Sequence, residues 1–147
     1  MDLSSTLYIG HADGASRFSR NLASVAWAIF TPLHTLFLSN GMCIGFVTNN
    51  QAKYDAVIGF SIDSLAHCIL HLHVHLYSLL LVMQLNGVYH VHNQVIFRKY
   101  LGVKLLVREF ETITFSQVPR AQNNYVDTIA NNILDWHLSH VYHRRQP

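Results

Sequence analysis

The pattern of hydrophobic, β-prone runs in the first forty residues predicts three strands, the first two of which are followed by turn signals. The runs are Ser5–Ala12 before Asp13-Gly14, Ser24–Phe30 before Pro32, and His34–Leu38. Connections this short join neighbouring antiparallel strands. The beginning of the chain therefore predicts a three-stranded antiparallel meander.

The hydrophobic period changes to helical spacing after this meander. Apolar side chains recur at helical intervals from Ala52 to about Cys68, and Thr48 or Asn49 is the expected N-cap. Alternation returns in Leu70–Leu76, which predicts a fourth strand. A short helix is expected over Ser78–Leu85, ended by Asn86-Gly87, a pair suited to a left-handed C-terminal stop.

Two more helices and one strand complete the pattern. In the next helix the expected buried stripe is Phe97, Leu101 and Leu105. A fifth strand, Thr112–Val118, ends at Pro119. The final helix is expected over Asn123–Leu138, with a buried stripe formed by Val126, Ile129, Ala130, Ile133 and Leu134. The resulting order is βββαβααβα, an α/β chain.

Composition predicts one core-rich domain. The 147 residues are 50% hydrophobic but only 12% charged, against about 25% in an average domain. The formal charge of +2 indicates no particular partner. Cys43 and Cys68 are expected to be reduced, buried residues of a cytoplasmic or nuclear protein. Secretion is not expected, because residues 1–6 lack a signal-peptide pattern.

A membrane association is not expected, although no Asp, Glu, Lys or Arg occurs between Asp63 and Arg98. Within that stretch His71, His73 and His75 alternate with apolar residues at the period of a strand. These histidines could bind Zn²⁺ or could form a half-buried polar sheet face. The second interpretation is favoured, because alternate positions on one strand rarely supply a tetrahedral site.

Four separated segments carry a family resemblance. They are Asp13-Gly14-Ala15-Ser16, the stretch Thr48–Tyr54 (TNNQAKY), the stretch Ser78–Gly87 (SLLLVMQLNG), and Val118–Asn123 (VPRAQN) followed by Asp127. In this order and spacing they resemble the ribonuclease H domains attached to the reverse transcriptases of plant retrotransposons. The resemblance implies a mixed five-stranded sheet with helices on both faces. The domain is expected over residues 5–138, with residues 139–147 as a C-terminal tail.

The resemblance also implies an activity and a set of site residues. Members cleave the RNA strand of an RNA–DNA hybrid with two Mg²⁺ ions held by carboxylates. Asp13 matches the first acidic position and Asp127 the last, whereas Lys53 and Tyr77 replace the two middle acids. Gln117 replaces a helper histidine. The residues expected by resemblance to contact nucleic acid are Ser16, Asn49, Asn50, Gln51, Ser78, Arg120 and Asn123.

These substitutions leave two hypotheses about the function of the chain. The formal charge of the four acidic positions falls from −4 in the family pattern to −1 here, so weak or absent Mg²⁺ binding is expected. Lys53 could instead pair with Asp13 or Asp127. The chain is then either a ribonuclease H with an impaired cluster or a non-catalytic remnant that binds nucleic acid weakly or is purely structural. A monomer is expected in both cases.

Simpler interpretations exist for several of these residues. Asp13-Gly14 is an ordinary turn signal, and Asp127 could only complement a helix dipole. The basic residues Arg98, Lys99, Lys104 and Arg108 could contact phosphates or could form a solvated helix face. Ser78 is not expected to be a hydrolase nucleophile, because no nucleophile-elbow motif surrounds it.

Overall fold

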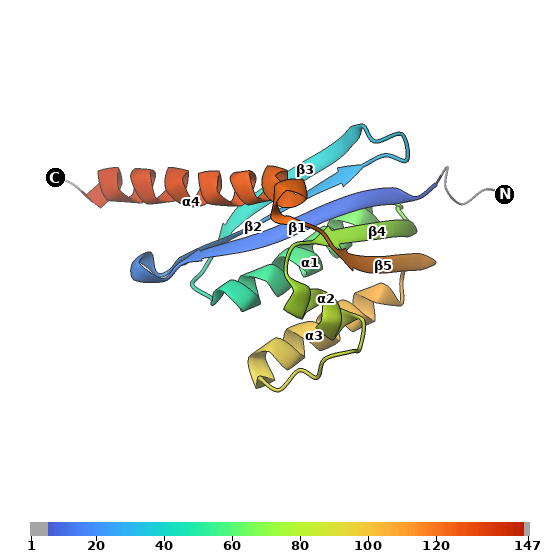
Figure 1. The fold of residues 1–147 in the computed structure, drawn as a ribbon. Helices are drawn as coiled ribbons and strands as arrows, with labels where there is room; N and C mark the ends of the chain where they lie inside the picture. Colours follow the sequence, from blue (N-terminus) through green and yellow to red (C-terminus); the bar gives the residue numbers. More distant parts are fainter. Residues whose placement is uncertain (1–5, 146–147) are drawn as a thin grey trace.

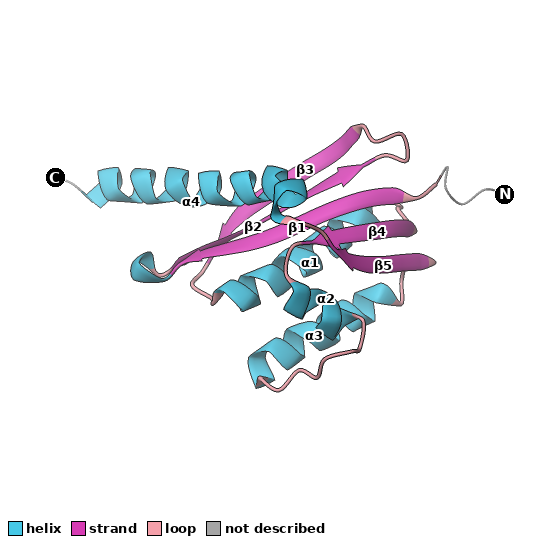
Figure 2. Ribbon diagram, in the orientation of Figure 1, coloured by secondary structure: helices cyan, strands magenta, loops and turns pink. Residues whose placement is uncertain are grey.

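A mixed five-stranded sheet forms the centre of the computed structural model, which describes residues 6–145 (Figures 1 and 2). The strands are β1 (Tyr8–Arg17), β2 (Leu22–Phe30), β3 (Leu36–Ile44), β4 (His71–Leu76) and β5 (Thr112–Gln117). The helices are α1 (Asn49–Ala66), α2 (Leu79–Leu85), α3 (Gln94–Val107) and α4 (Asn124–Arg145), and the 3-10 turns are η2 (Phe18–Arg20) and η3 (Arg120–Asn123).

The sheet has the strand order β3-β2-β1-β4-β5. The first three strands pair antiparallel through tight connections, as predicted for a meander. Strand β4 joins the sheet parallel to β1, and β5 joins parallel to β4, since helices connect these strands. The predicted element order and α/β class are confirmed.

Helices cover both faces of the sheet (Figure 1). Helix α1 packs on β1 and β2, while α4 crosses the opposite face over β1, β2 and β3. The main core lies between the sheet and α1, where Phe60 and Trp27 are buried. A smaller core joins β2 to α4 through Ala26, Ala28 and Val126. Two layers of helix around one sheet are the architecture implied by the family resemblance.

Local capping signals set the helix boundaries. Thr48 forms a capping box with Gln51 at the start of α1, and Ser78 caps α2 by accepting a hydrogen bond from the Leu81 amide. Gly87, just beyond α2, has a φ angle of 76°, the left-handed conformation that was predicted to stop this helix. The predicted N-cap at Thr48 and the predicted left-handed stop after α2 are confirmed.

Two strands are longer than predicted. Strand β1 continues through Asp13-Gly14 to Arg17 because β2 pairs with it along this whole length. Asp13 therefore lies inside a strand and not at its end. Strand β3 likewise continues to Ile44, and its pairing with β2 outweighs the turn tendency of Asn40-Gly41.

The predicted buried stripe of the α3 helix is wrong. Phe97, Leu101 and Leu105 are 43%, 45% and 60% exposed, whereas Ile96 and Val103 are buried. Helix α3 packs mainly on α1 in an outer layer and not on the sheet, so only a narrow face of it is covered.

The two cysteines are less buried than predicted. Cys68 is exposed and Cys43 is half-buried, so neither is the buried core residue that was predicted.

The last helix has its expected buried positions at Val126, Ala130 and Leu134, and it continues past the predicted end to Arg145. The expectations for residues 1–5 and 146–147 lie outside the described residues. Within residues 6–145, no helix is both long and apolar enough to cross a membrane.

Candidate functional site

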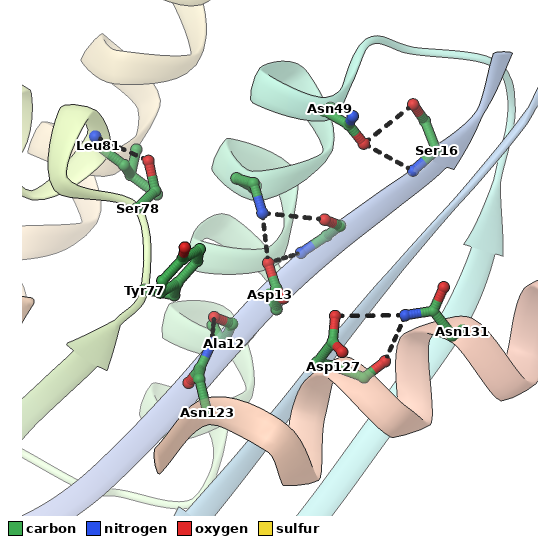
Figure 3. A network of polar contacts seen from close by, with 12 residues as sticks. Ala12, Asp13, Ser16, Asn49, Tyr77, Ser78, Leu81, Asn123, Asp127 and Asn131 are labelled. Carbon is green, nitrogen blue, oxygen red and sulfur yellow. Dashed lines mark hydrogen bonds and ion pairs between the residues drawn. The ribbon is translucent and has the colours of Figure 1, made fainter. Parts of the chain in front are cut away.

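A small cavity brings together the residues at all four acidic positions of the family pattern. It has a volume of about 140 Å³ and is lined by Asp13, Lys53, Tyr77, Arg120, Asn123 and Asp127. These residues come from β1, α1, the end of β4, η3 and α4. Segments far apart in the sequence therefore meet at one place, which Figure 3 shows from close by.

The ending of β4 explains why the cavity forms there. The β1–β4 register pairs His11 with His75. Strand β4 ends at Leu76, before it would reach the position that pairs with Asp13. Strand β1 continues without a β4 neighbour, and Tyr77 leaves the sheet beside Asp13 (Figure 3). A cavity beyond the carboxyl ends of parallel strands is a common location for a ligand site in α/β folds.

Lys53 forms an ion pair with Asp13. Its Nζ atom lies 2.7 Å from Oδ1 of Asp13 and 3.4 Å from the carbonyl oxygen of Gly14. The Gly14 amide donates a second hydrogen bond, of 2.9 Å, to the same carboxylate oxygen. The Asp13 and Lys53 side chains are 10% and 22% exposed. Of the two pairings expected for Lys53, the structure selects the one with Asp13.

Asp127 is held by its own helix. The Asn131 side-chain amide donates to the Asp127 carbonyl oxygen at 2.9 Å and to its carboxylate Oδ1 at 3.3 Å (Figure 3). The position of Asp127 in the first turn of α4 also suits the helix dipole. Both the structural and the site interpretations of Asp127 are compatible with this geometry.

Tyr77 and Arg120 also line the cavity, and Gln117 contacts the backbone of Tyr77. Tyr77 is 43% exposed, and the Arg120 guanidinium lies 6.0 Å from the centre of its ring. The Gln117 side-chain amide donates to the Tyr77 carbonyl oxygen at 3.2 Å. A neutral phenol and a cation thus occupy the side where the family resemblance implies a further carboxylate.

Most of the residues expected to contact nucleic acid also stabilise local structure. Asn49 accepts hydrogen bonds from the amide and hydroxyl of Ser16, at 3.0 and 3.1 Å. Gln51 and Ser78 take part in the helix caps described above. Asn123 is only 2% exposed and donates to the Ala12 carbonyl oxygen at 3.4 Å. The buried Asn123 side chain can therefore position β1 more readily than it can contact a ligand.

A second cavity lies beside the first and was not predicted. Its volume is about 280 Å³, and Lys53 lines both cavities. The wall includes Asn50 on α1, Ser78 before α2 and the segment His90–Asn93. No local pattern identified His90 or His92, because their proximity to α1 depends on the path of the chain between α2 and α3.

The described residues do not fit a two-Mg²⁺ centre. Mg²⁺ needs several oxygen ligands in near-octahedral geometry, and only Asp13 and Asp127 supply carboxylates to this cavity. One of them is already paired with an ammonium. Among the side chains that the structure describes (residues 6–17 and 19–140), no three from His, Cys, Asp or Glu are grouped so that they could hold a metal ion.

The alternating histidines of β4 form a half-buried polar sheet face. His71 and His73 interact through Nδ1 with the Thr112 and Thr114 hydroxyls of β5, at 2.8 and 2.5 Å. His75 packs against His11 of β1. The sheet-face interpretation is therefore the one that the contacts support.

Two of the four basic residues considered as phosphate contacts have partners within the domain. Lys99 forms a 2.7 Å ion pair with Asp55 on α1. The Lys104 ammonium donates to the carbonyl oxygen of Leu85 at the end of α2. These contacts attach α3 to its neighbours and favour a structural role for both lysines.

Comparisons with known proteins agree with this architecture. The family model described as "Reverse transcriptase-like" matches residues 11–133. A bifunctional protein of Mycobacterium tuberculosis is 31% identical over 125 residues, which are 84% of this chain and 34% of the relative. Ribonuclease HI of Halobacterium salinarum is 32% identical over 123 residues, 84% of this chain and 62% of the relative. The chain thus spans between one third and two thirds of these relatives.

Solved structures show the same fold. The crystal structure of the Halobacterium salinarum RNase H1 matches with a TM-score of 0.84 and 30% identity, covering 88% of this chain and 98% of that one. LC11-RNase H1, solved in complex with an RNA/DNA hybrid, matches with a TM-score of 0.82 and 27% identity, covering 89% and 99%. The chain therefore belongs to the reverse transcriptase-like family and has the ribonuclease H fold.

Proposed function

We propose that this chain is an RNA–DNA hybrid-binding domain of the ribonuclease H type in which Mg²⁺-dependent cleavage is slow. The relatives named as ribonucleases, and the relative solved with an RNA/DNA hybrid, support the substrate class. The cavity at the end of β4 supports the place of binding, because it joins the four positions that match the acidic pattern of the family.

The observation that carries the proposal of slow cleavage is the ion pair between Lys53 and Asp13, 2.7 Å long. An ammonium at this distance offsets the charge of the carboxylate that would otherwise attract a divalent cation. It would also repel that cation by about 4 kcal/mol per unit of charge at a separation near 4 Å and an effective dielectric constant near 20. Tyr77 supplies no second negative charge on the other side.

Binding is proposed to be weak at physiological salt and to show little sequence preference. The chain carries a formal charge of only +2, and sequence-independent affinity for nucleic acid depends on the number of phosphates neutralised by basic residues. Double-stranded A-form-like helices are recognised mainly by shape and backbone. Several polar side chains near the cavity are also engaged in local hydrogen bonds.

The test is a cleavage assay on a labelled RNA–DNA hybrid with Mg²⁺ or Mn²⁺, together with a binding titration of the same hybrid. We expect measurable binding and cleavage far slower than that of the Halobacterium salinarum ribonuclease HI. Single-stranded RNA and double-stranded DNA serve as substrate controls. Fast cleavage by the unmodified chain, lost in Asp13→Asn, would refute the slow-cleavage part. A complete absence of hybrid binding would refute the substrate class.

The wider setting is part of the same proposal. The resemblance of the four motifs supports an origin in a plant retrotransposon polyprotein, with the acidic cluster lost by substitution. We further propose a monomer that works in the cytoplasm or nucleus. Size-exclusion chromatography with light scattering tests the oligomeric state, and imaging of a tagged chain tests the location.

A further inference from the structure

The charges that face the cavity are balanced without any bound ion. Asp13 and Asp127 each contribute −1, and Lys53 and Arg120 each contribute +1, so the formal charge of the cavity lining is zero. A lining of four carboxylates would instead repel a phosphodiester unless cations were bound beside it. In this chain Lys53 and Arg120 provide the positive charge themselves.

Lys53 has donor capacity left for a ligand. An ammonium has three N–H donors, and the contacts of Lys53 within the cavity are with Asp13 and with the Gly14 carbonyl oxygen. Its side chain is 22% exposed and lines the cavity. The remaining donor can reach an anion there.

Arg120 supplies a second cation to the cavity lining. Its guanidinium lies over the Tyr77 ring, 6.0 Å from the centroid, which leaves its planar edge able to donate two parallel hydrogen bonds. Guanidinium groups bind phosphate oxygens in this bidentate manner. Lys53 and Arg120 thus both line this cavity, together with neutral Tyr77.

We infer that this cavity binds a backbone phosphate of the hybrid without a divalent metal, with the Lys53 ammonium as the resident cation. This inference rests on the proposed hybrid binding, and it concerns how that binding depends on Mg²⁺. The family resemblance implies metal ions between the carboxylates and the substrate. Here Lys53 occupies the position of a carboxylate ligand, and its ammonium supplies the positive charge that a metal ion would have brought.

The test measures hybrid affinity by fluorescence anisotropy, in excess EDTA and in Mg²⁺ at matched ionic strength. For the unmodified chain, we expect affinities that agree within about twofold, since no ion is needed. In Lys53→Glu the cavity lining carries a formal charge of −2, so affinity in EDTA should fall by about tenfold or more. Added Mg²⁺ should then recover part of this loss, which makes binding metal-dependent.

A matched control is Lys99→Glu. Lys99 also forms a 2.7 Å ion pair with an aspartate, Asp55, and its side chain has nearly the same exposure as that of Lys53, at 23%. It lies on α3 and is not part of the cavity lining. The affinity of this variant should remain insensitive to Mg²⁺. Circular dichroism and thermal melting establish that each variant is folded.

Lys53→Met provides a second variant if the glutamate variant does not fold. It should lower the affinity in EDTA and reduce the slope of log affinity against log salt by about one unit, which a purely structural defect would not do. Tighter binding of the unmodified chain in Mg²⁺, or unchanged EDTA affinity in both Lys53 variants, would overturn the inference while leaving hybrid binding intact. No binding by any form would refute the proposed function together with the inference.

Discussion

The imidazole rings of His11 and His75 lie edge to face, with their centroids 5.0 Å apart, at directly paired positions of β1 and β4. His73 contacts His75 in the same way at 4.7 Å, and His11 also interacts with the Asn123 side chain. Burial lowers the pKa of His11 and of His73. Burial and the two neighbouring histidines lower the pKa of His75 from 6.5 to about 4.

This cluster predicts that acid destabilises the fold. Because the folded-state pKa of His75 lies below its unfolded value, the unfolded chain binds more protons between pH 6.5 and about 4. The contribution of His75 to stability is therefore complete above this window and is lost as the pH falls through it. Urea unfolding at pH values above and within the window should show the loss.

His75→Asn is the informative variant for that prediction, since it removes the group that titrates. Its unfolding midpoint should depend less on pH between 6.5 and about 4 than that of the unmodified chain. His92→Asn, in the exposed segment before α3, serves as the control and should keep the original dependence. Identical pH profiles for all three proteins would contradict the prediction.

Gly14→Ala should destabilise the domain. A Cβ atom at position 14 would lie 2.3 Å from the backbone carbon of Ala52 on α1, which is closer than real contacts allow. Because backbone must shift to relieve the contact, we expect a loss of about 1–3 kcal/mol in the free energy of unfolding. Gly45→Ala is the control, since its Cβ would meet nothing within 4 Å. Equal stability of the two variants in urea would contradict the predicted close approach.

Tyr54→Phe should leave a buried polar atom without its partner. The Tyr54 hydroxyl donates a 2.7 Å hydrogen bond to Oε1 of Gln84, and the two residues are only 2% and 8% exposed. Burial also raises the pKa of Tyr54, which keeps the hydroxyl protonated as a donor. We expect a cost of about 1–3 kcal/mol in unfolding free energy.

A double-mutant cycle with Gln84→Met separates this hydrogen bond from packing. If the orphaned Gln84 oxygen causes the loss, the double variant should be more stable than the sum of the single effects predicts. Strict additivity of the two substitutions would indicate that packing, and not the Tyr54–Gln84 bond, is responsible.

Lys53→Glu combined with Tyr77→Asp should recover Mg²⁺-dependent cleavage of an RNA–DNA hybrid. Together they return the formal charge of the four family positions from −1 to −4. Each single variant should do little, because residues that act as a unit are strongly non-additive. Recovery should be partial, since Gln117 and residues 17–20 remain unrepaired.

The readout is the rate of hybrid cleavage by the four proteins of this cycle in Mg²⁺ and in EDTA. Asp13→Asn in the double variant is the control, and it should abolish the recovered activity. Robust cleavage by the unmodified chain that also needs Asp13 would show that the charge argument is wrong.

Features that depend on a few consecutive residues could be predicted from the sequence. The N-cap at Thr48 and the left-handed Gly87 set the ends of helices through local hydrogen bonds and backbone sterics. Strand β4 was recognisable because its buried residues alternate with histidines. The motif matches likewise identified the residues that line the candidate site.

Features that depend on neighbours distant in sequence could not be predicted. Strand β1 extends beyond its turn signal because β2 pairs with it, and Phe97 and Leu101 are exposed because α3 lies outside α1. A periodic apolar stripe shows that a helix could be buried on one side, but it does not show what covers that side.

The sequence alone shows that an ammonium and a phenol replace two acids of a four-acid pattern while two carboxylates remain, and hence that the site carries little negative charge. How these charges are paired depends on the folded structure. Lys53 lies 2.7 Å from Asp13, while Asp127 interacts with Asn131 one helical turn away. The reason is distance: Coulomb energies between these groups depend on separations of a few ångströms, and the packing of α1 and α4 against β1 fixes those separations.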